Sequence, residues 1–337
     1  MGRGAARLRA LVTGGGGFLG TALCRKLREQ DATVTSFSRG DYPHLREWGV
    51  KTVRGDLSDR DSITNAVRDH DIVFHVAAKA GVWGKRNEYF ESNVRGTEHV
   101  VAACRASGVA RLVHTSSPSV CFDGNDHRMA ASDLPYAESF LADYPESKAL
   151  AEQMVLAENG PNLATCALRP HLIFGPGDPH LLPRLIATAK SGKLAVVGDG
   201  RNEVTLCYVE NAAQAHLIAG QTLDDSAPHA GRAYFIGQEE PVNLWQWLNK
   251  ILKALDIPQI KRTVSQNTAY RVGAVLELVW KLFRLSGEPR MTRFVATQLA
   301  TTHTYTMKPA RDDFGYSEEI DIEEATQATL EWLKRTR

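Results

Sequence analysis

Cysteine is scarce in this sequence, with five residues among 337 and no Cys-x-x-Cys motif. An odd and scattered set argues against a disulfide framework and against a structural zinc site. Such a set is typical of reduced thiols in the cytoplasm, where most free cysteines pack as small hydrophobic residues. We therefore expect a cytoplasmic protein without a bound metal.

Strong charge of one sign and long apolar runs are also missing. The formal net charge is only +1, so no general field attracts nucleic acid and we expect no nucleic-acid partner. No apolar stretch is long enough to span a membrane, and the nearest, 272–285, is interrupted by Glu277, Lys281 and Arg284. We interpret this segment as a buried or substrate-lining helix. The alternative is a peripheral contact with membrane lipid or with another enzyme.

The first half of the sequence alternates short apolar strands with helical segments. The strands are rich in Val and Leu without a clean alternation, which is typical of strands buried on both faces. This rhythm predicts a parallel sheet with right-handed crossovers. The predicted strands are 8–13, 33–37, 51–54, 72–75, 111–115 and 164–168, and the predicted helices include 19–29, 88–106 and 144–158.

The chain is less regular and richer in Pro and Gly after Pro170. We expect a helix at 181–190, a short strand at 194–197 and a helix at 242–255. The predicted fold class is α/β, a Rossmann doubly wound parallel sheet with a smaller C-terminal substrate lobe. The Rossmann domain would comprise residues 1–170, with later segments at about 194–237 returning to it. Residues 171–337 would form mainly the substrate lobe.

A glycine-rich turn joins the first predicted strand to the first helix. Gly14, Gly17 and Gly20 have the spacing Gly-x-x-Gly-x-x-Gly. The first glycine permits a tight turn, the second lets a pyrophosphate approach the backbone, and the third allows the helix to pack closely on the strand. The helix N-terminus adds free N–H groups and a partial positive charge. This pattern predicts a dinucleotide site that includes Phe18 and Leu19.

The end of the second predicted strand bears on which dinucleotide binds. Chains that bind NAD usually place a carboxylate there, which accepts from the ribose 2′-OH. Here Ser38 and Arg39 stand at that point, and the first acid is Asp41. Because arginine pairs with a 2′-phosphate through forked hydrogen bonds, we predict NADP(H). The alternative is that Arg39 is a solvated turn residue. Asp56, after the third strand, would bind the adenine amino group or serve a local turn.

Tyr144 and Lys148 lie four residues apart in a predicted helix, so their side chains share one face. A phenol titrates near ~10 in water, and a neighbouring ammonium favours the phenolate. We therefore expect the pKa of Tyr144 to be lowered. Alone, such a pair would be an ordinary surface feature of a helix. Downstream of a dinucleotide site, it indicates a tyrosine that exchanges a proton with a carbonyl or an alcohol.

Taken in order, the motifs over residues 8–237 resemble the extended short-chain dehydrogenase/reductase family. In that family a serine after the fifth strand acts with the tyrosine and the lysine. The resemblance selects Ser117, with Ser116 as the second choice. Asn93 matches the family asparagine and joins Ser117, Tyr144 and Lys148 as an expected catalytic residue. The resemblance also implies cofactor contacts from residues that follow later strands, namely Leu57, Ala77, Ala78, Lys79 and Pro170.

Apolar segments at 75–84, 178–183 and 272–285 look like the branch that includes 3β-hydroxysteroid dehydrogenases and bacterial reductases of β-keto acids with two alkyl chains. The resemblance implies NADPH-dependent reduction of a β-keto group in a small apolar substrate with long chains, bound partly by Trp280 and Phe283. The alternatives are a 3β-hydroxysteroid or sterol dehydrogenase, a nucleotide-sugar epimerase and a non-catalytic NADP-binding protein. His75 and His114, at strand ends, are expected to be packed core residues.

The family often forms dimers through two helices of the first domain. The resemblance therefore implies a homodimer through 88–106 and 144–158. Segment 272–285 stays the candidate for a peripheral membrane or multi-enzyme contact.

Overall fold

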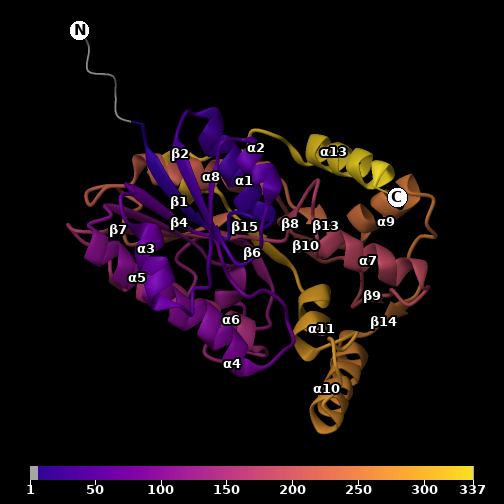
Figure 1. Ribbon diagram of the computed structural model, residues 1–337. Coiled ribbons are helices and arrows are strands. Elements are labelled where there is room, and N and C mark those ends of the chain that lie inside the picture. The colour runs from indigo at the N-terminus through magenta and orange to yellow at the C-terminus, as the bar shows by residue number, and fades with distance from the viewer. Residues whose placement is uncertain (1–6, 337) are drawn as a thin grey trace.

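The computed structural model describes residues 7–336 and is built around a seven-stranded sheet (Figure 1). All neighbouring strands run parallel. Their spatial order is β12 (Ala233–Ile236), β7 (Ala164–Pro170), β5 (Arg111–Thr115), β4 (Ile72–His75), β1 (Arg9–Thr13), β2 (Thr33–Ser38) and β3 (Lys51–Arg54). The strand order reverses between β1 and β4, which places a ligand crevice at the carboxyl ends of these two strands. The predicted Rossmann fold is thus confirmed, and all six predicted strands occur.

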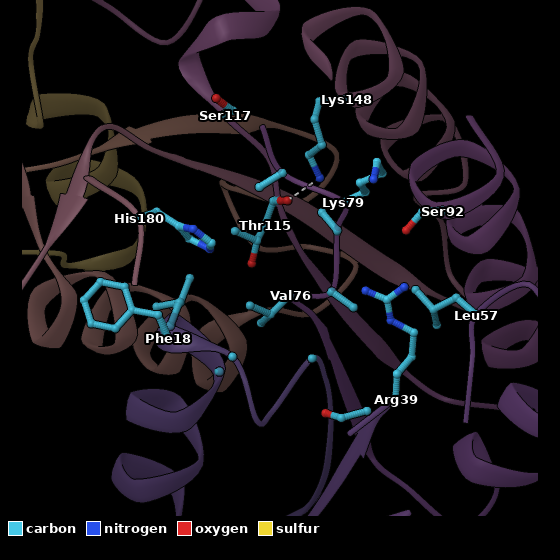
Figure 2. A pocket seen from close by; sticks show the side chains of 18 of the residues that line it. Phe18, Arg39, Leu57, Val76, Lys79, Ser92, Thr115, Ser117, Lys148 and His180 are labelled. Atoms are coloured by element: carbon cyan, nitrogen blue, oxygen red, sulfur yellow. Dashed lines mark hydrogen bonds between the residues drawn. The ribbon is translucent and has the colours of Figure 1, made fainter. Parts of the chain in front are cut away.

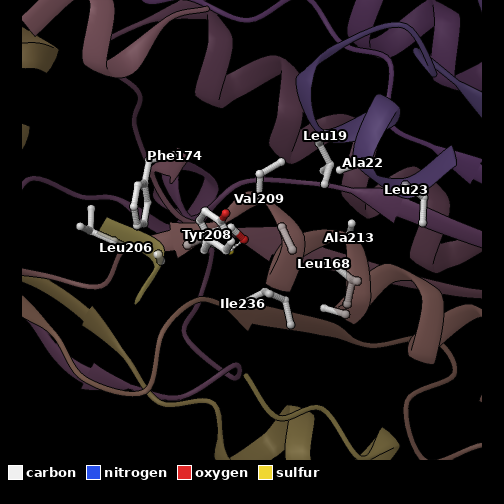
Figure 3. Close-up of a cluster of buried hydrophobic side chains, with 14 of the residues drawn as sticks. Leu19, Ala22, Leu23, Leu168, Phe174, Leu206, Tyr208, Val209, Ala213 and Ile236 are labelled. Atoms are coloured by element: carbon white, nitrogen blue, oxygen red, sulfur yellow. Dashed lines mark hydrogen bonds between the residues drawn. The ribbon is translucent and has the colours of Figure 1, made fainter. Parts of the chain in front are cut away.

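Helices cover both faces of this sheet (Figure 1). One layer contains α3 (Arg60–Val67), α5 (Gly96–Ser107) and α6 (Asp143–Ala157), and the other contains α1 (Phe18–Glu29) and α8 (Val209–Thr222). Successive residues of β1 point to opposite faces, so Leu11 joins one hydrophobic cluster while Ala10 and Val12 join the other. Figure 3 shows the cluster that contains Ala10 and Val12, where Leu23 of α1 faces Ala213 of α8. Burial on both faces explains the unbroken apolar runs of the strands.

The helix predicted at 88–106 is not regular. It consists of α4 (Arg86–Tyr89), a π-helical segment η1 (Phe90–Arg95) and α5. A π-helix widens the turn and often marks a functional site. Here the widened turn carries Asn93, whose side chain is buried. The periodicity of the sequence could not show this change of pitch, because the apolar spacing differs by only one residue in a single turn.

The remaining elements form smaller sheets and a helical rim. One sheet has the order β13-β10-β15-β6, and β11 pairs β8 while β14 pairs β9. Helix α12 packs on β12 and α8, so the end of the chain also contacts the large sheet. The elements are α2 (Pro43–Glu47), η2 (Pro118–Cys121), β6 (His127–Ala130), β8 (Ile173–Phe174), α7 (Leu181–Lys190), β9 (Val196–Val197), β10 (Glu203–Val204), β11 (Cys207–Tyr208), β13 (Val242–Asn243), α9 (Leu244–Ala254), β14 (Thr263–Val264), α10 (Gln266–Phe283), α11 (Arg293–Ala300), β15 (His303–Tyr305), α12 (Lys308–Phe314) and α13 (Ile322–Arg335).

The helix predicted at 181–190 has these bounds, whereas the strand predicted at 194–197 keeps only its last two residues. The helix predicted at 242–255 begins two residues later, because Asn243 caps it by accepting from Gln246 N. All five cysteines are buried and unpaired. Within residues 7–336, no helix has the length and apolar character needed to cross a membrane.

Candidate active site

A cleft of about 720 Å³ lies at the carboxyl ends of the central strands (Figure 2). It is lined by the loop after β1, the end of β2, the loops after β4 and β5, and the start of α6. Every residue predicted to contact the dinucleotide lines it: Gly14, Gly17, Phe18, Leu19, Gly20, Ser38, Arg39, Asp56, Leu57, Ala77, Ala78, Lys79, Tyr144, Lys148 and Pro170. The fold therefore gathers segments from distant parts of the sequence into one cleft.

The glycine loop has the geometry that a pyrophosphate needs. Gly14 has φ +70°, and a Cβ there would lie 2.8 Å from the Ala77 Cα. A Cβ on Gly20 would collide with the Gly14 carbonyl oxygen. Gly17 is the N-cap of α1 and carries no side chain, so no side-chain oxygen caps the first-turn N–H groups. These free N–H groups can donate to an anionic phosphate, so the glycine loop can hold the pyrophosphate of a dinucleotide.

The end of β2 presents a hydroxyl and a guanidinium to the same cleft. The Ser38 Oγ accepts from Gly16 N at 3.2 Å and so supports the glycine loop. Arg39 is exposed, and its side chain extends beside Leu57 in Figure 2. Within residues 7–336 it forms no ion pair, which leaves its charge available to a ligand. Asp56 lies at the cleft, but its Oδ1 accepts from Ser58 N and Ser58 Oγ, both at 2.9 Å. One carboxylate oxygen thus supports a local turn, and a contact of Asp56 with the adenine amino group stays a prediction.

Ser117 and Tyr144 are brought together at the other end of the cleft. Ser117 follows β5 and begins η2, whereas Tyr144 lies in the first turn of α6. Burial raises the pKa of Tyr144, and the neighbouring Ser117 hydroxyl, which favours the phenolate, only partly opposes this shift. The expectation of a lowered pKa is therefore wrong for this arrangement. Since Tyr144 keeps its proton at neutral pH, it is suited to act as a proton donor.

Lys148 lies one turn further along α6 and is almost fully buried. Its Nζ donates to the Thr115 carbonyl oxygen at 2.7 Å and to His114 Nε2 at 3.1 Å (Figure 2 draws the first bond). Burial lowers the pKa of Lys148 to about 7, and the carboxylate of Glu152 opposes this shift. An ammonium has three N–H groups, so one remains for a ligand in the cleft.

His114 is a neighbour of Lys148 that sequence reasoning missed. Both predicted core histidines are buried. His75 is satisfied by threonines, since Nδ1 bonds Thr13 Oγ1 at 2.8 Å and Nε2 bonds Thr97 Oγ1 at 2.9 Å. His114 instead contacts Lys148, and its Nδ1 has no hydrogen-bond partner among the described residues. Its position on β5, three residues before Ser117, was the only signal in the sequence.

Removal of the His114 ring should move the pH dependence of turnover. In His114→Leu the charged form of Lys148 loses an acceptor, so the pKa of Lys148 should fall below about 7. If activity needs the ammonium, the alkaline loss of kcat should begin roughly one pH unit lower than in the wild type. His114→Gln offers an amide oxygen and should recover part of the shift. A uniform loss of kcat at every pH, with the alkaline limb unchanged, would limit His114 to packing.

Asn93 supports the cleft from behind rather than lining it. Its Oδ1 accepts from Lys79 N at 2.7 Å, and its Nδ2 donates to Lys79 O at 3.0 Å and to Ser147 Oγ at 2.9 Å. The amide thus joins the loop after β4 to helix α6. In this arrangement Asn93 positions the groups around it, and a direct part in catalysis stays a prediction.

Other residues of the cleft were not assigned to the dinucleotide from the sequence, although some belong to the segments 75–84 and 178–183 that were singled out as apolar. Their meeting depends on the whole fold. Ser116, the second-choice serine, lines the cleft with a buried hydroxyl that has no partner among the described residues. The other additional lining residues include Val76, Thr115, Leu172, Ile173, Asp178 and His180.

A second cavity of about 810 Å³ adjoins the cleft and shares Lys79 and Glu88 with it. Its apolar lining includes Val82, Trp83, Phe140, Leu141, Trp280 and Leu285. Trp280 lines this cavity as expected. The same expectation is wrong for Phe283, whose side chain is 66% exposed and lies outside the lining. Phe283 is the last residue of α10, and its side chain there is not covered by the rest of the protein.

The profile of the 3-beta hydroxysteroid dehydrogenase/isomerase family matches residues 11–266. The chain belongs to that family. It is 50% identical to the 2-alkyl-3-oxoalkanoate reductase of Stenotrophomonas maltophilia (strain K279a), over 94% of this chain and 97% of the relative. It is 34% identical to the sterol-4-alpha-carboxylate 3-dehydrogenase (decarboxylating) of Mus musculus, over 98% of this chain and 92% of the relative. These members of the 3-beta hydroxysteroid dehydrogenase/isomerase family are oxidoreductases, and this chain is an oxidoreductase of the same kind.

A solved structure of MoeE5 in complex with UDP-glucuronic acid and NAD has the same fold. Its TM-score is 0.72 at 24% identity, with 98% of this chain and 100% of that chain covered. At this identity the likeness concerns the fold alone. In this fold, the glycine loop at the carboxyl end of β1 supports a Rossmann-type dinucleotide site.

Proposed function

We propose that the chain catalyses the NADPH-dependent reduction of 2-alkyl-3-oxoalkanoates to 2-alkyl-3-hydroxyalkanoates. The observation that carries the proposal is the 50% identity to a reductase of that name over 94% of this chain. The cleft supports it, because Ser117, Tyr144 and Lys148 line it together. The residues of the glycine loop would hold the dinucleotide, which when bound supplies a hydride to the carbonyl carbon.

The protein residues would stabilise the charge that develops on the carbonyl oxygen. Tyr144 would donate its phenolic proton to this oxygen, which becomes the product hydroxyl. Ser117 would donate a hydrogen bond to the same oxygen. The resulting tyrosinate would be stabilised by the positive charge of the Lys148 ammonium. Lys148 would also donate to the ribose hydroxyls with the N–H group that the protein leaves free.

Substrate chemistry suits the two adjoining cavities. Both relatives named above act, by their names, on molecules with a carboxylate on the carbon beside the oxygen-bearing carbon. The carboxylate would need a cation where the two cavities meet. Lys79 stands there, held at its backbone by Asn93, and its Nζ is paired with Glu88 at 3.0 Å. Arg86 is paired with both Asp143 and Glu146, so the substrate carboxylate would replace Glu88 as the partner of Lys79. Alkyl chains would fill the apolar outer cavity, with about 0.8 kcal/mol for each methylene removed from water.

A sterol 3-dehydrogenase is the second candidate, favoured by the 34% identity over nearly the whole chain. Purified protein would be assayed with a racemic 2-alkyl-3-oxoalkanoate and with a sterol-4-carboxylate, each with NADPH, NADH, NADP and NAD. We expect NADPH oxidation on the first substrate and none of comparable rate on the sterol. A higher kcat/KM for the sterol would make the second candidate correct. Inactivity on both, despite NADPH binding, would leave a non-catalytic NADP-binding protein.

Cofactor choice should depend on Arg39. In Arg39→Ala the 2′-phosphate loses its forked partner, so the KM for NADPH should rise roughly 10-fold to 100-fold while the KM for NADH changes little. Arg60→Ala is a matched control, because Arg60 is also exposed and charged but lies outside the cleft lining. Steady-state kinetics with both cofactors measures the effect. An unchanged preference for NADPH would mean that Arg39 is a solvated turn residue.

We also propose a homodimer that forms through α5 and α6, the helices predicted for this role. Multi-angle light scattering of the purified chain would measure its mass. A monomer at micromolar concentration would contradict the proposal.

A further inference from the structure

Helix α10 carries the largest group of exposed apolar side chains in residues 7–336. Across the described residues, nine large hydrophobic side chains are exposed. Six of these nine lie on α10 or just after it. Four of them, Val272, Val275, Leu278 and Leu282, recur every three or four residues along one face of α10. Leu278 and Leu282 are 65% and 70% exposed. Figure 1 shows α10 extending away from the large sheet. The six residues, called here the α10 apolar face, are Val272, Val275, Leu278, Leu282, Phe283 and Leu285.

The exposure of this face does not result from a loosely held helix. On the opposite side of α10, a Cβ on Gly273 would lie 2.6 Å from the Thr292 carbonyl carbon, so α10 packs closely on the start of α11. Glu277 is buried and accepts from Arg293 N at 2.7 Å and from Arg293 Nε at 2.8 Å. The helix is therefore fixed in a position that keeps its apolar face outward. A contiguous patch of this kind marks a binding surface.

The charges around the α10 apolar face are positive. Arg271, Lys281, Arg284 and Arg290 are exposed, and none forms an ion pair within residues 7–336. The acids nearby are already paired, Glu277 with Arg293 and Glu288 with Arg184. A second copy docked face to face would bring two sets of these cations together. An apolar stripe flanked by lysine and arginine suits a bilayer with anionic headgroups instead.

The same helix forms one wall of the outer cavity. Trp280, Lys281 and Arg284 of this segment line it, and Lys281 lies over the Trp83 ring at 5.8 Å. The cavity continues through Lys79 into the cleft that contains Tyr144. A surface against which α10 rests would therefore adjoin the mouth of the substrate cavity.

We propose that the α10 apolar face docks on an anionic lipid bilayer, so that a long-chain substrate enters the outer cavity from the lipid. The entry of substrate rests on the proposed function, whereas the docking does not. Leucine side chains would insert among the acyl chains, and the four cations would lie at the headgroups. The outer cavity would then open toward the phase in which an apolar substrate is most soluble.

Flotation of the full chain with phosphatidylcholine vesicles, with and without phosphatidylglycerol, tests the docking. We expect flotation with the anionic vesicles that weakens at high salt. The double variant Leu278→Ser, Leu282→Ser should lose about tenfold or more in partitioning. Arg271→Gln, Arg290→Gln should weaken binding to the anionic vesicles only. Met129→Ser, which alters a residue that is 50% exposed on β6, is the matched control and should float like the wild type.

Two outcomes would overturn the proposal. In the first, the wild type stays in solution with both vesicles, or the double serine variant floats equally well. In the second, vesicles are not bound and light scattering shows a dimer that the serine variant converts to a monomer, which would make this face a self-interface. Flotation needs neither cofactor nor substrate, so inactivity on 2-alkyl-3-oxoalkanoates would leave the result intact. Turnover of a short-chain, water-soluble substrate without vesicles should be equal in the wild type and the serine variant.

Discussion

Tyr144→Phe should reduce kcat by about 10³-fold, the largest effect we expect on catalysis from a single substitution. The phenylalanine ring keeps the edge contact with Tyr89, whose ring centroid lies 6.4 Å away, so folding should be preserved. What disappears is the proton donor for the substrate oxygen. Because burial raises the pKa of Tyr144, the wild-type phenol holds this proton throughout the neutral range. The measurement is the steady-state rate of NADPH oxidation with a 2-alkyl-3-oxoalkanoate.

The control for this variant is cofactor binding. Tyr144 lies at the end of the cleft opposite to Arg39, so the Kd for NADPH, measured by fluorescence titration, should change by less than about threefold. Ser117→Ala should cause a smaller loss, because it removes one hydrogen bond and leaves the proton donor. Normal turnover by Tyr144→Phe with normal NADPH binding would show that another group donates the proton. The proposed mechanism would then be wrong, although the dinucleotide site would stand.

The parts of the site that could be predicted lie where a strand ends. Parallel strands bring their carboxyl ends to one edge of the sheet, so the order of strands in the sequence already places the loops after β1, β4 and β5 beside one another. The glycine loop and Arg39 could be assigned for that reason. Local spacing likewise placed Tyr144 and Lys148 on one helical face. In these cases a short-range pattern determines a position in space.

The parts that could not be predicted depend on contacts between distant segments. His114 and Lys148 are 34 residues apart, and only the packing of α6 on β7, the neighbour of β5 in the sheet, brings their nitrogens to 3.1 Å. The π-helical turn at Asn93 changes the helical pitch once, which periodicity does not reveal. The pKa of Tyr144 was misjudged because spacing indicates a neighbouring charge but gives no measure of burial. Phe283 was misplaced because the end of α10 leaves the body of the protein, and no local pattern shows where contact stops.

A buried ion pair beneath the catalytic helix should have the largest effect on stability. Glu152 lies one turn after Lys148 on α6 and is fully buried, and Arg169 on β7 is 3% exposed. Arg169 Nη2 donates to Glu152 Oε1 at 2.6 Å, and Arg169 Nε donates to Oε2 at 3.0 Å. Tyr136 OH donates to the same carboxylate at 2.7 Å. The pair thus joins helix α6, which carries Tyr144 and Lys148, to the strand beside it.

Glu152→Gln should lower the free energy of unfolding by about 3–5 kcal/mol, because it leaves the Arg169 charge buried without a counter-charge. Thermal unfolding should shift down by on the order of 10 °C. Glu323→Gln is the matched control, since its pair with Lys250 is exposed and should contribute less than about 1 kcal/mol.

The double variant Glu152→Met, Arg169→Met separates the charge from the packing. It removes both charges and fills the space with flexible apolar side chains, so it should be more stable than Glu152→Gln. Circular dichroism melts of the four proteins measure this order. If the double variant is the least stable, the forked hydrogen bonds contribute more than the desolvation of the two charges costs. If instead the order is as expected, this pair is retained for its role in fixing α6. The kcat of the double variant should then fall further than the loss of folded protein accounts for. The reason is that α6, which carries Tyr144 and Lys148, is no longer joined to β7 by the ion pair.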